Sequence, residues 1–315
     1  MCAVFGFLDY SKKVSAKTLK RLLQALSVAA ECRGRDATGM SYVKHGKMAT
    51  FKKAKPAHKV KLYFPRGTTA VIGHTRFTTQ GSEKHNYNNH PFEGTTSEHR
   101  FALAHNGVLY NDVKLRREQG LPDTKIETDS YIAVQLLEQQ DAVNEETLRY
   151  MAEAVAGNFV FTVLRDDNTL YLIKGDNPLV IWHYPALGLY LYASTRNILV
   201  EAVKAVGFYH HCEEHLPYDG NIVKICASGE MTVSAFSFTE PHFSPLYHHA
   251  APVKSDPEVD YYEDLLMLCG CYGLDSEDAE MLMDWGYDID EIEEMLVDHE
   301  YRDAVLEEAK MLHEQ

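Results

Sequence analysis

Short β-rich runs separated by turn signals dominate the first 240 residues, and this pattern limits the chain to a fold built on sheets. Three turn sequences, His45-Gly46, Asp166-Asp167-Asn168 and Ser228-Gly229, each lie between two such runs and predict hairpins. Because a hairpin joins antiparallel strands, we expect antiparallel sheets and not a doubly wound parallel sheet. The runs predicted as strands include Ala3–Leu8, Thr69–His74, Phe101–His105, Phe159–Leu164, Leu170–Lys174, Val180–Tyr184, Leu189–Ala193 and Asn221–Cys226.

A few helices interrupt these strands, so the predicted fold class is α+β. In Ser15–Ala30 five apolar residues recur at helical spacing behind Ser15, which can cap the helix. Three further segments fit helices: Asp129–Gln139, Glu145–Ala154 and Asn197–Val206.

The distribution of charge divides the chain. Its formal net charge is −15, but residues 254–315 alone hold 21 acidic and 3 basic residues. We therefore predict a domain over residues 2–240, a linker over 241–257 that contains prolines and histidines, and a small acidic all-helical module over 258–315. The module's predicted helices are Asp260–Leu268, Ser276–Trp285, Asp288–Asp298 and Tyr301–His313, and its predicted core is Leu265, Leu268, Leu282, Ile289, Ile292, Leu296, Val305 and Leu306. Its acidic exterior is a solvated face or a surface that could dock a basic partner protein.

Several classes of protein do not fit this composition. No run approaches about 18 uncharged apolar residues, so we expect no membrane span. The acidic charge argues against nucleic acid as a partner. Six scattered cysteines and the absence of an export signal at Met1–Asp9 favour reduced thiols and a cytoplasmic location.

Cys2 directly follows the initiator Met1. Removal of that methionine would place a thiol and a free α-amine on one carbon. The α-amine, with a pKa of about 7.7–8.0, could then accept the proton of a thiol whose ordinary pKa is about 8.5. A single residue would supply both a nucleophile and its base.

Further segments supply groups that an amide-cleaving cysteine needs. The Asn106 side chain and the Gly107 N–H could stabilise an oxyanion, although Asn-Gly is also a common turn dipeptide. The Arg76 guanidinium matches the α-carboxylate of an amino-acid substrate, and Asp129 matches its ammonium group. Asp129 could instead cap a helix, or do both.

Taken in order, these segments resemble the class II glutamine amidotransferase domain of the N-terminal-nucleophile hydrolases. They are Arg33-Gly34-Arg35-Asp36-Ala37-Thr38-Gly39, Gly73-His74-Thr75-Arg76-Phe77-Thr78-Thr79-Gln80-Gly81, Asn89-His90-Pro91-Phe92, Ala104-His105-Asn106-Gly107 and Glu127-Thr128-Asp129-Ser130. The resemblance covers most of residues 2–210.

The resemblance implies a four-layer αββα sandwich with two antiparallel sheets, and a reaction that releases ammonia from L-glutamine through a thioester. By the same resemblance Cys2 is the nucleophile, Arg33 and Gly34 position it, and Asn106 with Gly107 forms the oxyanion hole. Arg76, Thr79 and His90 then lie in the glutamine pocket, and Asp129 binds the glutamine α-amine. No cofactor is implied.

Some residues depart from the family pattern. Ala3 stands where glycine is frequent, Phe77 replaces a frequent tryptophan, and Gln80 replaces the histidine of the glucosamine-6-phosphate synthase branch. No acceptor domain is expected after residue 240, so a stand-alone glutaminase that serves a separate ammonia-accepting synthase is the leading hypothesis. The alternatives are an amidohydrolase for another γ-glutamyl amide and a regulatory or binding protein that retains the fold.

The remaining histidines and cysteines predict no metal site. His210-His211-Cys212 with His215 has a metal-like composition but an incomplete ligand set, so we expect a surface or loop cluster. Cys269 and Cys271 are expected to face the small helical core as ordinary thiols.

Overall fold

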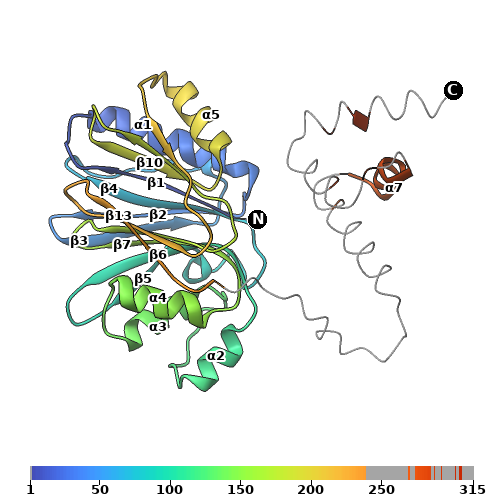
Figure 1. The fold of residues 1–315 in the computed structure, drawn as a ribbon, viewed down its shortest axis with the longest axis horizontal. Coiled ribbons are helices and arrows are strands. Elements are labelled where there is room, and N and C mark those ends of the chain that lie inside the picture. Colours follow the sequence, from blue (N-terminus) through green and yellow to red (C-terminus); the bar gives the residue numbers. More distant parts are fainter. Residues whose placement is uncertain are drawn as a thin grey trace. The chain divides into compact units, whose positions relative to one another are not determined.

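The computed structural model describes residues 2–238, and in the tail residues 269, 274–284, 287, 292, 302, 305 and 306. The chain forms two compact units, Met1–Phe243 and Ser244–Gln315. In the first unit two antiparallel sheets are stacked face to face, and helices cover their outer faces, as Figure 1 shows. The predicted α+β class and the αββα order of layers are confirmed.

The larger sheet has seven strands, and β1 with β4 lies near its middle. Helices α1 (Ala16–Ala29) and α5 (Arg196–Val206) cover its outer face. Ser15 caps α1, as predicted, by accepting a hydrogen bond from the Thr18 backbone nitrogen at 3.1 Å. The strands, in sheet order, are β11 (Glu213–His215), β9 (Val180–Tyr184), β10 (Leu189–Ala193), β1 (Ala3–Asp9), β4 (Ala70–Arg76), β2 (Ala37–Lys44) and β3 (Lys47–Lys53).

The second sheet has six strands. Helices α3 (Tyr131–Gln139) and α4 (Glu145–Ala154) cover its outer face, and α2 (Asp112–Glu118) lies beside them. Its strands, in sheet order, are β13 (Met231–Ala235), β12 (Asn221–Ile225), β8 (Leu170–Lys174), β7 (Gly157–Arg165), β6 (Arg100–Leu109) and β5 (Phe92–Thr95). All three predicted hairpins are present, as β2–β3, β7–β8 and β12–β13.

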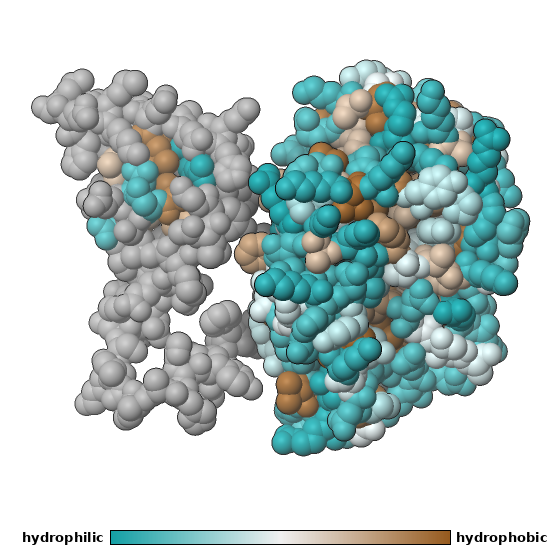
Figure 2. All heavy atoms as spheres, turned by 180° about the vertical axis from the view of Figure 1, so that it is seen from behind, coloured by the Kyte–Doolittle hydropathy of each residue, from teal (hydrophilic) through white to brown (hydrophobic). Residues whose placement is uncertain are grey.

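Apolar side chains fill the space between the sheets. Val4 and Ile72 from the larger sheet pack with Ala104, Val160 and Leu172 from the smaller one, and all five are buried. Because strand side chains alternate in direction, the same strands also send apolar residues outward beneath the helices. The face of this unit seen in Figure 2 is mainly hydrophilic, with hydrophobic side chains in small groups.

Two segments differ from their predicted boundaries in ways that affect the candidate site. Strand β6 continues through Asn106-Gly107 to Leu109, so this dipeptide lies in a strand and is not a turn. Helix α3 begins at Tyr131 rather than Asp129. The short elements β5, β11 and α2 were not predicted, because each has fewer than eight residues and shows little periodicity. The same holds for three 3-10 helices, Ala30–Cys32, Ala57–Lys59 and Asn86–Asn88.

The tail unit contains helix α7 (Ser276–Asp284). Leu282, Ile292 and Leu306 are buried in one cluster with Cys269, and Val305 packs against it, as predicted. The other predicted core residues, Cys271, most of the remaining predicted helices and the predicted linker lie outside the described residues. No helix among the described residues is long and apolar enough to cross a membrane.

Candidate active site

Cys2 directly precedes β1, which lies in the interior of the larger sheet. Its side chain is buried, with 9% of the residue exposed. The Arg33 Nε donates a hydrogen bond to the Cys2 carbonyl oxygen at 2.9 Å. This contact fixes the backbone of the residue that carries the thiol, and it brings together two of the predicted site residues.

The Cys2 thiol packs against the backbone that follows β4. Its Sγ is 3.4 Å from both the nitrogen and the carbonyl oxygen of Phe77, so it can accept from one and donate to the other. Burial raises the pKa of the Cys2 thiol, and the Phe77 N–H and the charge of Arg76 oppose that effect. A neutral thiol in this environment needs a nearby base before it can act as a nucleophile.

Gly34 allows the segment after α1 to approach the same backbone. A Cβ atom on Gly34 would lie 2.5 Å from the Arg76 carbonyl carbon and 2.6 Å from the Phe77 nitrogen. The Asp36 backbone nitrogen donates to the Arg76 carbonyl at 2.9 Å, and the Asp36 carboxylate accepts from the Thr78 nitrogen at 2.7 Å. The Arg33–Asp36 segment therefore supports both Cys2 and the backbone around its thiol.

Arg76 is a buried cation whose hydrogen bonds go to neutral acceptors. The residue is 2% exposed. Its guanidinium donates to Asn89 Oδ1 at 2.7 Å, to the Gln80 carbonyl at 2.5 Å and to the Gly81 carbonyl at 2.9 Å. Burial lowers the pKa of Arg76, but a guanidinium stays protonated at neutral pH. Within residues 2–238 no carboxylate forms an ion pair with it.

Asn88 connects the Arg76 loop to the segment that carries Asp129. The Asn88 side chain donates to Glu127 Oε2 at 2.7 Å and accepts from the Glu127 nitrogen at 3.0 Å. The Thr128 hydroxyl donates to the Asn88 carbonyl at 2.9 Å. The predicted segment that carries Asp129 is thereby held to the residue directly before the predicted segment that starts at Asn89, although about 40 residues separate them in the sequence.

His90 and Thr79, both predicted in the substrate pocket, differ in their environments. His90 is buried, and its ring centre lies 4.3 Å from that of His74 and 4.5 Å from that of Phe92. Neither His90 ring nitrogen has a hydrogen-bond partner among the described residues. Burial lowers the pKa of His90 and lowers that of His74 to about 3, so both rings are neutral at pH 7. Thr79 is exposed, on the loop that holds the Arg76 guanidinium.

Asn106 is a buried amide with unused hydrogen-bonding capacity. The residue is 0% exposed, and neither its Nδ2 nor its Oδ1 has a partner in the described part of the chain. Its backbone carbonyl accepts from Asn177 Nδ2 at 3.1 Å. The following Gly107 has φ +145°, and a Cβ atom there would lie 1.8 Å from the Asn158 carbonyl oxygen. Only glycine fits this position.

Asp129 is a buried carboxylate held by neutral donors. It is 2% exposed and accepts from the Leu109 backbone nitrogen at 2.6 Å and from the Ser130 hydroxyl at 3.1 Å. It does not cap α3, because neither bond comes from the first turn of that helix. Like Arg76, it forms no ion pair with a described residue.

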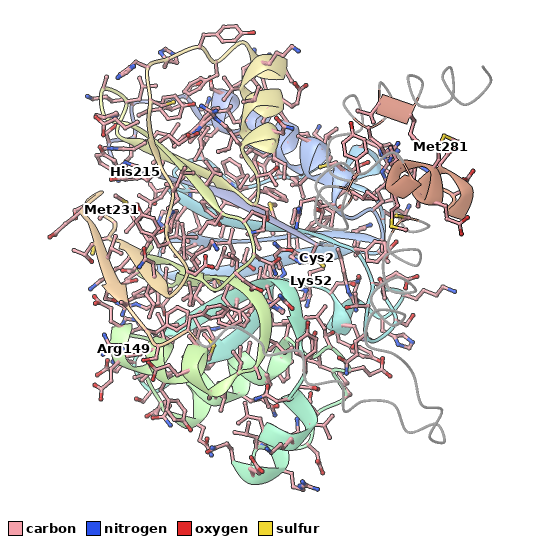
Figure 3. All side chains as sticks on the ribbon, turned by 45° about the vertical axis from the view of Figure 1, so that its right-hand side comes forward. Cys2, Lys52, Arg149, His215, Met231 and Met281 are labelled. Atoms are coloured by element: carbon pink, nitrogen blue, oxygen red, sulfur yellow. The ribbon has the colours of Figure 1, made fainter. Side chains whose placement is uncertain are left out.

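One hydrogen bond joins the two sheets beside these groups. His74 Nε2 on β4 lies 2.9 Å from the His105 carbonyl oxygen on β6. Each histidine precedes a site residue, since Arg76 follows His74 by two positions and Asn106 follows His105 directly. Cys2, Arg76 and Asp129 lie near enough that the charges of Arg76 and Asp129 affect the thiol pKa. Figure 3 marks the position of Cys2.

Three supporting groups were not predicted from the sequence. Asn89 holds the Arg76 guanidinium, Asn177 holds the Asn106 backbone, and the pair His105–Ser130 extends the hydrogen bonding of Asp129, with 2.7 Å between His105 Nδ1 and Ser130 Oγ. Asn89, His105 and Ser130 belong to the segments that carry the resemblance, so their positions in the sequence indicated that they lie near the site. No sequence pattern indicated Asn177, because it bonds to the Asn106 carbonyl from a distant part of the sequence.

Comparison with known proteins gives a consistent result. The sequence profile of a family described as a glutamine amidotransferase domain matches residues 74–201. Glutamine–fructose-6-phosphate aminotransferase (isomerizing) of Geobacillus kaustophilus is 29% identical over 192 residues, which is 58% of this chain and 30% of that protein. The enzyme of the same name from Staphylococcus aureus strain Mu50 is 32% identical over 197 residues, with the same coverage of 58% and 30%. The chain therefore spans under a third of the length of these curated relatives.

A solved structure supports the fold alone. The glutamine phosphoribosylpyrophosphate amidotransferase from B. subtilis, complexed with ADP and GMP, superposes with a TM-score of 0.58 at 19% identity. The match covers 76% of this chain and 50% of that chain.

Proposed function

We propose that the class II glutamine amidotransferase domain carried by this chain, which has the N-terminal-nucleophile hydrolase fold, hydrolyses the side-chain amide of L-glutamine to glutamate and ammonia. The observation that carries the proposal is a pair of buried, oppositely charged groups that form no ion pair with any residue in the described range 2–238. Arg76 and Asp129 are both 2% exposed, and each is held by neutral groups. A buried charge that no opposite charge contacts directly is costly, so these two groups fit a ligand that brings an α-carboxylate and an α-ammonium.

The nucleophile in this proposal is Cys2 after removal of Met1. The α-amine takes the thiol proton, and the Sγ atom attacks the Cδ carbon of glutamine. The negative charge that develops on the amide oxygen is stabilised by Asn106 Nδ2 and the Gly107 N–H, since an oxyanion is best met by donors already in place. The buried Asn106 amide, which has no hydrogen-bond partner within residues 2–238, supports this role.

The intermediate then releases ammonia and water completes the cycle. The Cδ–N bond breaks as the α-ammonium of Cys2 passes its proton to the leaving nitrogen, which leaves a γ-glutamyl thioester. The α-amine next accepts a proton from water while the water oxygen attacks the thioester carbon. The C–S bond breaks, glutamate forms, and Cys2 is regenerated. Arg33 and Gly34 position Cys2 through the contacts described above, while Thr79 and His90 complete the pocket.

The direct test is an assay of purified protein for glutamate and ammonia release, with the N-terminus checked by intact mass. We expect turnover of L-glutamine by protein that lacks Met1. Glutamine should be compared with other γ-glutamyl amides that share its head group. If another amide is turned over faster, that amide and not glutamine is the substrate. If processed protein turns over none of the amides, the proposal is contradicted.

We expect Arg76→Lys to raise the KM for glutamine by about 10- to 100-fold. Lysine keeps the positive charge but cannot present the planar fork that binds a carboxylate at two points. Steady-state kinetics measures the effect. Arg35→Lys is the matched control, because the Arg35 side chain is 73% exposed and should leave KM unchanged. An unchanged KM in Arg76→Lys would remove Arg76 from the substrate pocket.

Removal of residues 244–315 is expected to leave kcat and KM within about twofold of the full chain, because separate compact units can fold alone. All the proposed site residues lie between Cys2 and Asp129, and the tail has its own buried cluster. The same assay and the melting temperature check this. Loss of activity together with unfolding would show that the tail belongs to the catalytic unit.

The acceptor of the ammonia is proposed to lie outside these 315 residues, in a synthase partner. The aminotransferases with which the chain aligns are more than three times as long as the aligned part. Docking of such a partner by the acidic tail stays a prediction.

A further inference from the structure

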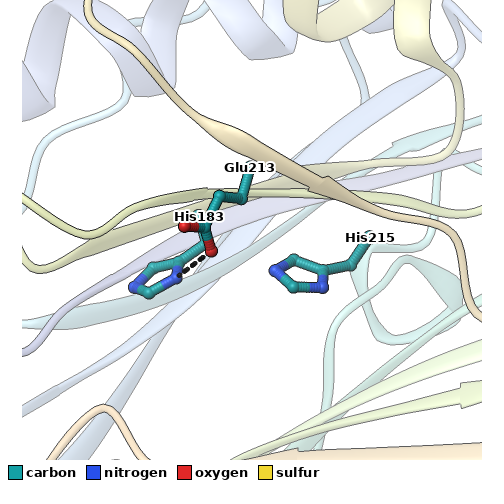
Figure 4. Close-up of side chains that lie close together, drawn as sticks. All are labelled: His183, Glu213 and His215. Carbon is teal, nitrogen blue, oxygen red and sulfur yellow. Dashed lines mark ion pairs between the residues drawn. The ribbon is translucent and has the colours of Figure 1, made fainter.

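Two histidines and a glutamate meet at the edge of the larger sheet, away from the proposed active site. His183 lies on β9, and Glu213 with His215 lies on the edge strand β11. Glu213 pairs directly with His183, and His215 is two residues further along β11. Since side chains on one face of a strand recur every two residues, the three side chains share one face, as Figure 4 shows.

The distances among their ligand atoms suit a small cation. One ligand atom from each residue lies within 4.8 Å of the other two. His183 Nδ1 and Glu213 Oε2 are 3.6 Å apart. In a tetrahedral site with bonds of about 2.0–2.1 Å, ligand atoms are about 3.3 Å apart, so only small side-chain rotations are needed.

Two tyrosines orient the His183 ring so that one of its nitrogens can bind a metal ion. The Tyr10 hydroxyl lies 3.0 Å from His183 Nε2, and the Tyr190 ring stacks on the imidazole at 4.1 Å with an interplanar angle of 10°. If Nε2–H donates to Tyr10, the lone pair of Nδ1 points toward Glu213. A hydrogen bond to the second ring nitrogen is the usual support of a metal-binding histidine.

The contacts made by residues 2–238 do not account for His215. Its Nε2 is buried and has no hydrogen-bond partner in residues 2–238. The contact between His183 Nδ1 and Glu213 Oε2 does not involve His215. The Glu213 side chain is 56% exposed, so an ion and a water ligand could reach the cluster from solvent.

We propose that His183, Glu213 and His215 bind a divalent transition-metal ion of the zinc class, with water in the fourth position. Two imidazoles and one carboxylate form a donor set that zinc accepts readily. The ion would connect β11, a strand of three residues at the sheet edge, to β9. This role is structural, because the ion would add a link between the two strands to their backbone pairing and to the hydrogen bond that Trp182 Nε1 donates to Glu214 Oε2 at 2.8 Å.

The site is independent of the proposed glutaminase chemistry. His183 pairs with Tyr190 of β10, which in turn pairs with Leu8 of β1. Leu8 is six residues from Cys2, a separation of about 20 Å along an extended strand. Figure 3 shows Cys2 and His215 in different parts of the unit.

The test is a calorimetric titration of the full-length chain with Zn²⁺. It should use a Cys2→Ala background, because the thiol and α-amine of a processed N-terminal cysteine also chelate metal. We expect His215→Ala and Glu213→Gln each to weaken binding to one site by at least about tenfold, since loss of a group that only supports a ligand already costs 10- to 100-fold. His211→Ala, at an exposed histidine of the same segment, is the matched control and should bind as the parent does.

A second readout separates loss of a ligand from loss of structure. Zn²⁺ should raise the melting temperature of the parent and of His211→Ala, and should raise it less in His215→Ala and Glu213→Gln. Glu213→Gln is informative because it keeps the shape of an exposed side chain. Absence of Zn²⁺ binding by the parent would overturn the site, and so would equal affinity in the parent and both ligand variants.

Discussion

Cys2→Ala is expected to lower the kcat for glutamine hydrolysis by on the order of 10⁴-fold or more, since loss of a nucleophile removes the covalent route altogether. Alanine leaves the α-amine, the Arg33 contact to the residue-2 carbonyl and the substrate pocket in place. Glutamine binding should therefore persist. The measurements are glutamate release for kcat and calorimetry for glutamine affinity.

The control for this variant is Cys226→Ala. Cys226 is a partly buried free thiol between β12 and β13, and its loss should leave kcat unchanged. Intact mass must show that Met1 is absent from the parent and from both variants. Retention of activity in processed Cys2→Ala would refute the thioester mechanism, and an active parent that keeps Met1 would refute the α-amine as base.

For Asn106→Ala, kcat should fall by about 10²- to 10³-fold with little change in KM, because an oxyanion donor acts mainly in the transition state. The folding stability of Asn106→Ala should not fall. The Asn106 side chain is buried without a hydrogen-bond partner in the described region, so its removal relieves an unsatisfied polar group. The melting temperature should be unchanged or higher.

This combination distinguishes a catalytic amide from a structural one. Asn197→Ala, on the exposed surface of α5, is the matched control and should change neither kcat nor melting temperature. If Asn106→Ala lost activity in proportion to a lower melting temperature, the amide would be structural. If its kcat matched that of the parent, Asn106 would not belong to the oxyanion hole.

Local patterns predicted most elements because they depend on neighbouring residues. Helix α4 has the predicted bounds Glu145–Ala154, and strands β8, β9 and β10 have theirs. The strand predicted to end at His105 shows the limit of this approach, because it continues through Asn106-Gly107 to Leu109. The dipeptide favours a turn locally, but β7 pairs with β6 through and beyond it and keeps it extended.

The chemical groups of the candidate site could be predicted, whereas their environments could not. Arg76 and Asp129 were expected to hold a substrate head group, and those roles stay predictions. That Arg76 is held by Asn89 and two carbonyls, and Asp129 by Leu109 and Ser130, depends on where separate loops and strands meet.

The sequence by itself determined which reactive groups the chain has, their order, and the alternation that buries one face of each strand. Only the tertiary structure decided which groups meet. His183 and His215 are 32 residues apart, and the register of β9 against β11 brings them together, so no local spacing could reveal the cluster. The physical reason is that helix and turn formation depends on nearby residues, whereas sheet register and stacking are fixed by contacts distributed over the whole unit.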